Sequence, residues 1–110
     1  MNKIRRKEIM AAIKGLSVVS GKIENDGLEQ HINELQDIIS DIQMILEEET
    51  DYMENIPENL QGGERYGRAE EACESLEEAV DILDYISIDD SIESIVDDID
   101  KATDCLSDAM

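Results

Sequence analysis

The sequence is poor in aromatic residues and in the residues that form catalytic centres. Its 110 residues include three tyrosines, no tryptophan, no phenylalanine, one histidine and two cysteines. An almost wholly aliphatic apolar set is typical of narrow helix-packing seams and argues against an enclosed ligand pocket. His31 alone cannot complete a Ser-His-Asp or Cys-His set, nor the two Glu-x-x-His pairs of a di-iron bundle. We therefore predict a non-enzymatic protein with no metal site and no cofactor.

The sequence also lacks a long hydrophobic run and a paired-cysteine motif. No stretch approaches the roughly 18 apolar residues that a membrane-spanning helix requires. The charged start Met1–Lys7 is followed by Glu8 and Lys14, which interrupt the apolar stretch that a secretory signal needs. Cys73 and Cys105 lie far apart with no histidine nearby, so we predict reduced thiols packed between helices. These absences predict a cytoplasmic protein without a membrane partner.

Basic residues are scarce after the first 22 positions. Six of the nine basic residues lie within residues 1–22, where Glu8 is the one acidic residue. The rest of the chain contains all the other acidic residues and only three basic ones, Arg65, Arg68 and Lys101. The formal net charge is −20. A surface of this sign repels nucleic acid and anionic lipid, whereas it attracts basic clefts, above all those of proteins that handle DNA or RNA. The charge therefore argues against direct nucleic-acid binding and predicts a basic-surfaced protein partner.

Apolar residues recur every three or four positions in four segments, which predicts an all-α fold. Pro57 and the glycine pair at 62–63 predict a tight turn at mid-chain. Two joints, near 24–27 and 87–91, lie at similar distances on either side of that turn. The predicted single domain covers residues 1–110, with helices at about residues 3–22, 28–55, 64–87 and 90–109.

The joints leave two arrangements open. The chain is predicted to form an antiparallel helical hairpin whose arms either bend together or fold back into a four-helix bundle. An unbroken arm from residue 3 to 55 would be roughly 80 Å long at about 1.5 Å per residue. Because a lone pair of such arms would bury little apolar surface, we expect fold-back or dimerisation, and we predict a homo-oligomer.

Acidic residues follow the last two predicted helices in two rows, which we call the acidic stripes. Steps of three and four residues place each stripe on one face of its helix, with about one charge per 5–6 Å of axis. A single DNA strand carries one charge per roughly 3.4 Å. The stripes are therefore either a solvated surface or a mimic of nucleic acid, and as the mimic they are the candidate partner-binding residues. They comprise Glu70, Glu74, Glu77, Asp81 and Asp84, then Asp89, Glu93, Asp97, Asp100, Asp104 and Asp108.

The residues around the mid-chain turn form a second candidate site. Arg65 and Arg68 stand in the first turn of the following helix, where the helix dipole disfavours cations. These arginines either pair with Glu54, Glu58 or Glu64 and hold the turn together, or they stand at an exposed recognition tip. The residues of that tip are Tyr52, Leu60, Arg65 and Tyr66.

A basic cluster occupies the start of the chain. In a hairpin the two chain ends are neighbours, so we predict that the cluster neutralises Asp104 and Asp108 on the last helix. The alternative, a nucleic-acid contact, would offer only a few phosphate contacts against a repulsive background. The cluster consists of Lys3, Arg5, Arg6 and Lys7.

The segment Asp51–Tyr66, DYMENIPENLQGGERY, together with the start Met1–Lys7, MNKIRRK, resembles a family of short acidic helical proteins encoded by bacteriophages and prophages. The match covers the N-terminal tip, the turn and the start of the helix after it. The family has no settled activity, so the resemblance implies an infected or lysogenic bacterial host rather than a mechanism. This chain is longer in both arms than typical members, as expected for a hairpin extended away from its tip.

Charge and resemblance together favour a phage-type inhibitor that binds a host defence protein, such as a nuclease, a restriction enzyme or a CRISPR-type effector. The alternative is a self-assembling scaffold or adaptor whose binding surfaces are the seams Ile32–Leu46 and Ile92–Leu106. A third interpretation is a bundle that sequesters a small molecule at a subunit interface lined by the N-terminal arginines. Salt separates the first two, because screening weakens charge mimicry but not the packing of aliphatic seams.

Overall fold

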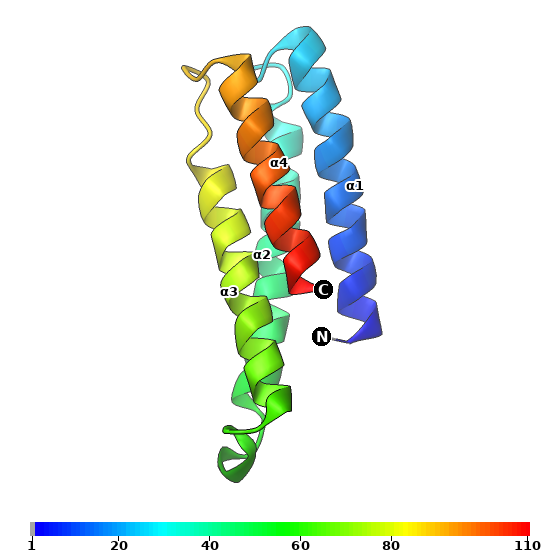
Figure 1. The fold of residues 1–110 in the computed structure, drawn as a ribbon. Helices are drawn as coiled ribbons and strands as arrows, with labels where there is room; N and C mark the ends of the chain where they lie inside the picture. Colours follow the sequence, from blue (N-terminus) through cyan, green and yellow to red (C-terminus); the bar gives the residue numbers. More distant parts are fainter. Residues whose placement is uncertain (1) are drawn as a thin grey trace.

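Four helices run alternately up and down and fold back on one another (Figure 1). The computed structural model describes residues 2–110, and within them there is no strand. The predicted all-α fold is confirmed, and of the two arrangements left open the chain adopts the four-helix bundle. The helices are α1 (Lys3–Asp26), α2 (Ile32–Glu54), α3 (Glu64–Asp84) and α4 (Ile92–Ala109), with a short 3-10 turn, η1 (Glu58–Leu60), between α2 and α3.

The helices begin and end at residues with clear local reasons. Oδ1 of Asn2 accepts a hydrogen bond of 2.8 Å from the backbone N–H of Arg5, which caps α1. α1 continues past the predicted helix end at residue 22 to Asp26, and it ends within the predicted joint at Gly27, whose φ of 88° suits glycine alone. Within the predicted joint near 87–91, Ser91 caps α4 by accepting a hydrogen bond from the backbone N–H of Ser94. Asp90 accepts a hydrogen bond from the backbone N–H of Ser87 in the preceding loop.

Each helix packs against its two neighbours in the ring α1–α2–α3–α4, and α4 closes the ring on α1. The core is aliphatic and contains residues from all four helices. The two seams predicted as assembly surfaces bury most of their residues in this core, including Leu35, Ile42, Ile99 and Leu106. The chain therefore covers most of both seams itself.

The bundle is elongated, with extents of 51 × 21 × 17 Å. The lower parts of α2 and α3 project beyond the ends of α1 and α4, so the turn at η1 stands clear of the other helices (Figure 1). α1 begins and α4 ends part of the way along the bundle (Figure 1). Within residues 2–110, no helix combines the length and the apolarity needed to cross a bilayer.

Candidate protein interaction surfaces

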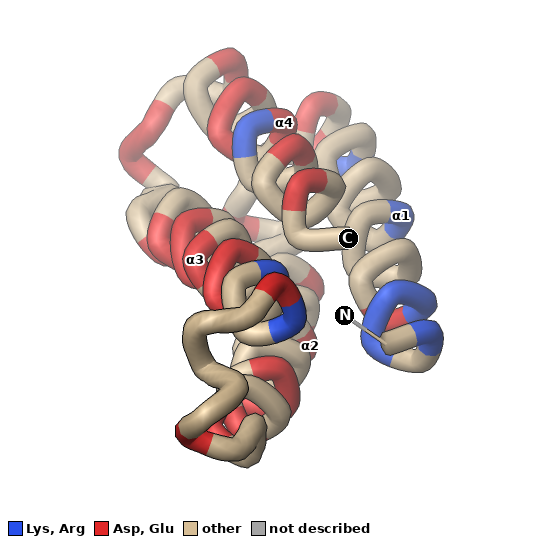
Figure 2. Tube along the Cα trace, turned by 60° about the horizontal axis from the view of Figure 1, so that its bottom comes forward, with Lys and Arg blue, Asp and Glu red and all other residues tan. Residues whose placement is uncertain are grey.

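The acidic stripes lie on the outside of the bundle. All the carboxylate residues of both stripes are exposed, on α3, on α4 and, for Asp89, in the loop between them. Figure 2 shows the acidic positions of α3 and α4 on two adjacent helices. The stripes do not merge into one row, because Glu77 leans toward α2, where it lines a hollow with Glu47, Thr50 and Glu54. The α4 stripe points directly away from the core.

The stripe carboxylates lack cationic partners. Within residues 2–110, none of them forms an ion pair, although Lys101 lies on α4 itself. Like charges at these spacings disfavour the helix by about 0.2–0.5 kcal/mol per pair. The outer faces of α3 and α4 therefore carry dense, uncompensated negative charge.

Charge is divided unequally among the helices. α1 has six basic and three acidic residues, whereas α2 has eight acidic residues and no basic one. α3 and α4 also carry a net negative charge. The basic positions of Figure 2 accordingly cluster on α1. One helix of the bundle is thus positive while the other three are negative.

A buried ion pair at the start of α1 was not predicted from the sequence. Nε of Arg5 donates to Oε2 of Glu49 at 2.6 Å, and the two side chains are 11% and 0% exposed. The prediction that the basic cluster neutralises Asp104 and Asp108 is therefore wrong for Arg5, and no residue of 2–110 forms an ion pair with either aspartate. The signal was present, since Glu49 lies seven residues after Ile42 and so falls on the buried seam of α2.

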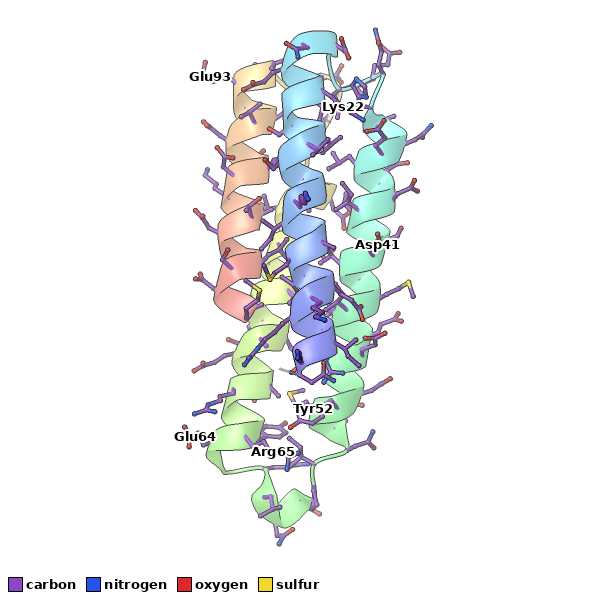
Figure 3. The ribbon with its side chains drawn as sticks, turned by 90° about the vertical axis from the view of Figure 1, so that its right-hand side faces the viewer. Lys22, Asp41, Tyr52, Glu64, Arg65 and Glu93 are labelled. Atoms are coloured by element: carbon purple, nitrogen blue, oxygen red, sulfur yellow. The ribbon has the colours of Figure 1, made fainter. Side chains whose placement is uncertain are left out.

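The predicted recognition tip is mostly tied into the fold. Nε of Arg65 donates to the hydroxyl of Tyr52 at 2.6 Å, and Figure 3 labels both residues near the turn. The Tyr52 ring also lies within cation–π distance of both Arg5 and Arg65. Arg68 pairs with Glu64, so the predicted ion pairing at the turn holds for Arg68 but not for Arg65. Tyr66 is half-buried, and only Leu60 of the predicted apolar tip residues is exposed.

At the opposite end, charged residues join α1 to α2. Nζ of Lys22 donates to Oε2 of Glu34 at 3.1 Å, and Nε2 of His31 lies 2.8 Å from Oδ2 of Asp26. The hydrogen bond from Lys22 lowers the pKa of Glu34 below its usual value. These contacts hold the α1–α2 connection, and His31 therefore has a structural role.

Both thiols are free and lie between helices. Cys73 is buried, with its Sγ 3.6 Å from Oγ1 of Thr50, and Cys105 is half-buried. Burial raises the pKa of each thiol, and nearby carboxylates add to the effect. The neutral thiol is a poor nucleophile, so neither cysteine has the character of a catalytic group.

The exposed acidic faces of α3 and α4 are thus the candidate interaction surface. No protein-family model, no curated protein and no solved structure matches this chain.

Proposed function

We propose that this protein is a non-enzymatic inhibitor that binds a nucleic-acid-binding protein through the acidic stripes of α3 and α4. The observation that supports the proposal is that every stripe carboxylate is exposed and that none forms an ion pair within residues 2–110. A surface that serves only for solvation gains stability from interspersed lysines. Lys101 is the one lysine on α3 and α4, and such scarcity is understandable if the acids must meet a cationic groove.

The helical framework favours this use of the charges. Apart from Asp89, the stripe residues are fixed on helices that each pack against two neighbours, so their backbone positions are already set before a partner arrives. Preorganised groups bind with a smaller loss of conformational entropy than groups on a mobile segment. A basic groove that normally holds phosphates would therefore find a rigid row of negative charges of comparable spacing.

The partner that we propose is a host defence protein such as a nuclease, a restriction enzyme or a CRISPR-type effector. This choice rests on the resemblance of Asp51–Tyr66 to acidic phage-encoded proteins and on the chemistry of the stripes. Defence proteins of these classes hold nucleic acid in positively charged channels. The buried state of the helix seams gives no support to a scaffold that assembles through them.

The proposal is tested by neutralising the α3 stripe in the variant Glu74→Gln/Glu77→Gln/Asp81→Asn/Asp84→Asn. The immobilised wild-type protein is used to capture partners from a bacterial lysate at low salt, followed by elution with a salt gradient and by competing DNA. We expect the variant to keep its helical circular dichroism and to lose the DNA-displaceable partner. Retention of that partner by the neutralised variant would contradict the proposal.

A control variant of the same net charge separates stripe recognition from bulk charge. Glu24→Gln/Glu29→Gln/Glu54→Gln/Glu58→Gln removes four exposed carboxylates that lie outside the stripes. We expect this control to bind the partner as the wild type does. Equal loss of binding in both variants would show that total charge, rather than the stripes, attracts the partner.

A further inference from the structure

The outer face shared by α1 and α2 carries exposed apolar side chains. On α1 they are Ile4 (69%) and Val18 (52%), which lie seven residues before and after Ala11, and on α2 Met44 (59%). Between the two helices lies a hollow of about 280 Å³, whose lining includes Ala11, Ile38 and Met44. These side chains form an exposed apolar patch of the kind found at sites of protein association.

The same face carries opposite charges on its two helices. Lys7 and Lys14 lie two helical turns apart on α1, and Asp41 and Glu48 lie two turns apart on α2. All four are exposed, and within residues 2–110 none of them forms an ion pair. Figure 3 looks onto α1, with α2 beside it and Asp41 labelled. The face therefore has a positive half and a negative half, separated by apolar side chains.

The heights of these residues along the bundle follow from two ion pairs between the helices. Arg5 pairs with Glu49, and Lys22 pairs with Glu34, so the residue numbers total 54 in one pair and 56 in the other. Because α1 and α2 are antiparallel, residues whose numbers total about 55 lie at the same height. Lys7 is therefore level with Glu48, and Lys14 is level with Asp41.

We propose that the α1–α2 face binds the same face of a second copy of this chain, about a two-fold axis parallel to the helices. Such an axis keeps every residue at its height and exchanges left for right, so α1 of one copy lies on α2 of the other. Lys7 then meets Glu48 of the second copy, and Lys14 meets Asp41 of the second copy. Met44 comes level with Ala11 of the second copy, so a large side chain faces a small one.

Charge selects this arrangement over the other two-fold packing. An axis perpendicular to the helices would place α1 on α1 and α2 on α2, with lysines facing lysines and carboxylates facing carboxylates. The sides of the bundle that lack α1 carry net negative charge and repel a second copy. Because α1 packs against both α2 and α4, two sides include the positive helix. We choose the α1–α2 side because it combines that helix with the hollow and the exposed Met44, and because it is complementary to itself. This proposal does not depend on the proposed function.

Charge reversal tests the interface. We expect the wild type to show, by sedimentation equilibrium, twice the 12.4 kDa mass of one chain. Variant K7E/K14E and variant D41K/E48K should each self-associate at least about a hundredfold more weakly, because like charges then face each other. Mixing the two variants should restore a dimer, since each reversed helix meets the oppositely reversed helix of the other copy. Restoration in the mixture also shows that both variants are folded.

A matched control fixes the location of the interface. D97K/D104K makes the same change of charge as D41K/E48K, but on the outer face of α4, and it should leave the wild-type dimer intact. A wild-type mass of one chain throughout the concentration series overturns the proposal, as do equal losses in the control and in the interface variants. Failure of the mixture to dimerise would contradict the proposed packing of α1 of one copy on α2 of the other. Binding to vesicles of anionic lipid that K7E/K14E abolishes, without a dimer, would assign the face to a membrane surface instead.

Discussion

Glu49 occupies a position where the seam of α2 otherwise places aliphatic residues. It follows Leu35 and Ile42 at seven-residue intervals, and its side chain is 0% exposed. A buried carboxylate is tolerated only with compensating charge and hydrogen bonds, and Arg5 provides a guanidinium at 2.6 Å. Because Arg5 lies 44 residues away in sequence, this contact fixes how far along α2 the first turn of α1 must lie.

Removal of Arg5 is therefore expected to be costly. We expect Arg5→Ala to lower the free energy of unfolding by about 3 kcal/mol, because it leaves buried negative charge without the guanidinium. Urea denaturation measures the change, since guanidinium chloride would screen the charges. Arg6→Ala, at an exposed neighbouring position, should change stability by less than about 0.5 kcal/mol.

The double variant Arg5→Met/Glu49→Leu distinguishes a charge effect from lost packing. It removes both charges and keeps apolar volume, so we expect it to recover most of the stability that Arg5→Ala loses. If the double variant is as unstable as Arg5→Ala, packing around the Arg5 stem accounts for the loss.

At the scale of helices, periodicity was sufficient to find all four elements and the central turn. Aliphatic spacing depends only on the sequence, so seams such as Ile92–Leu106 could be identified before the fold was known. The choice between bending and folding back could not be predicted from the sequence. Gly27 allows the helix to end, but it does not determine the direction that the chain takes afterwards. For the same reason the exposure of the stripes was predictable, whereas the Arg5–Glu49 and Arg65–Tyr52 contacts require the closed bundle.

Two glycines in and after α1 should respond oppositely to alanine. Gly21 lies within the helix with open space where a Cβ would stand, so Gly21→Ala should stabilise the protein by about 0.5–1 kcal/mol. Gly27, at φ 88° and ψ 161°, adopts a conformation that alanine rarely takes, so Gly27→Ala should destabilise it by about 1–3 kcal/mol. Thermal unfolding of the two variants beside the wild type measures both effects. Equal shifts of the same sign would contradict this account of the joint.

Over the whole molecule, repulsion among unpaired carboxylates opposes the compact state. The net charge of −20 is confined to a body 51 Å long and about 20 Å across. Self-repulsion of this kind is relieved when salt shortens the distance over which charges interact. The helices must therefore be held together mainly by the aliphatic core, against the field of their own surface.

Salt should accordingly stabilise the fold. Raising ionic strength from about 0.01 M to about 0.15 M shortens the Debye length from about 30 Å to about 8 Å. We expect the unfolding midpoint to rise by about 5 °C, equivalent to roughly 1 kcal/mol in a domain of this size. Calorimetry at constant protein concentration measures the shift, and the neutralised α3 variant should show a smaller one. A midpoint that falls with salt would mean that attractive pairs outweigh the repulsion.

The concentration of basic residues on α1, the one helix with net positive charge, also gives the molecule an electric dipole across its width. α1 contacts α2 and α4, so α3 stands diagonally opposite to it in the ring. In the field of a cationic protein, a freely tumbling copy would be turned so that α3 leads and α1 trails. Productive encounters would then be more frequent than random collision allows, and this gain in association rate would fade as salt is added. The uneven division of charge among four helices thus sets the direction from which a partner is first met.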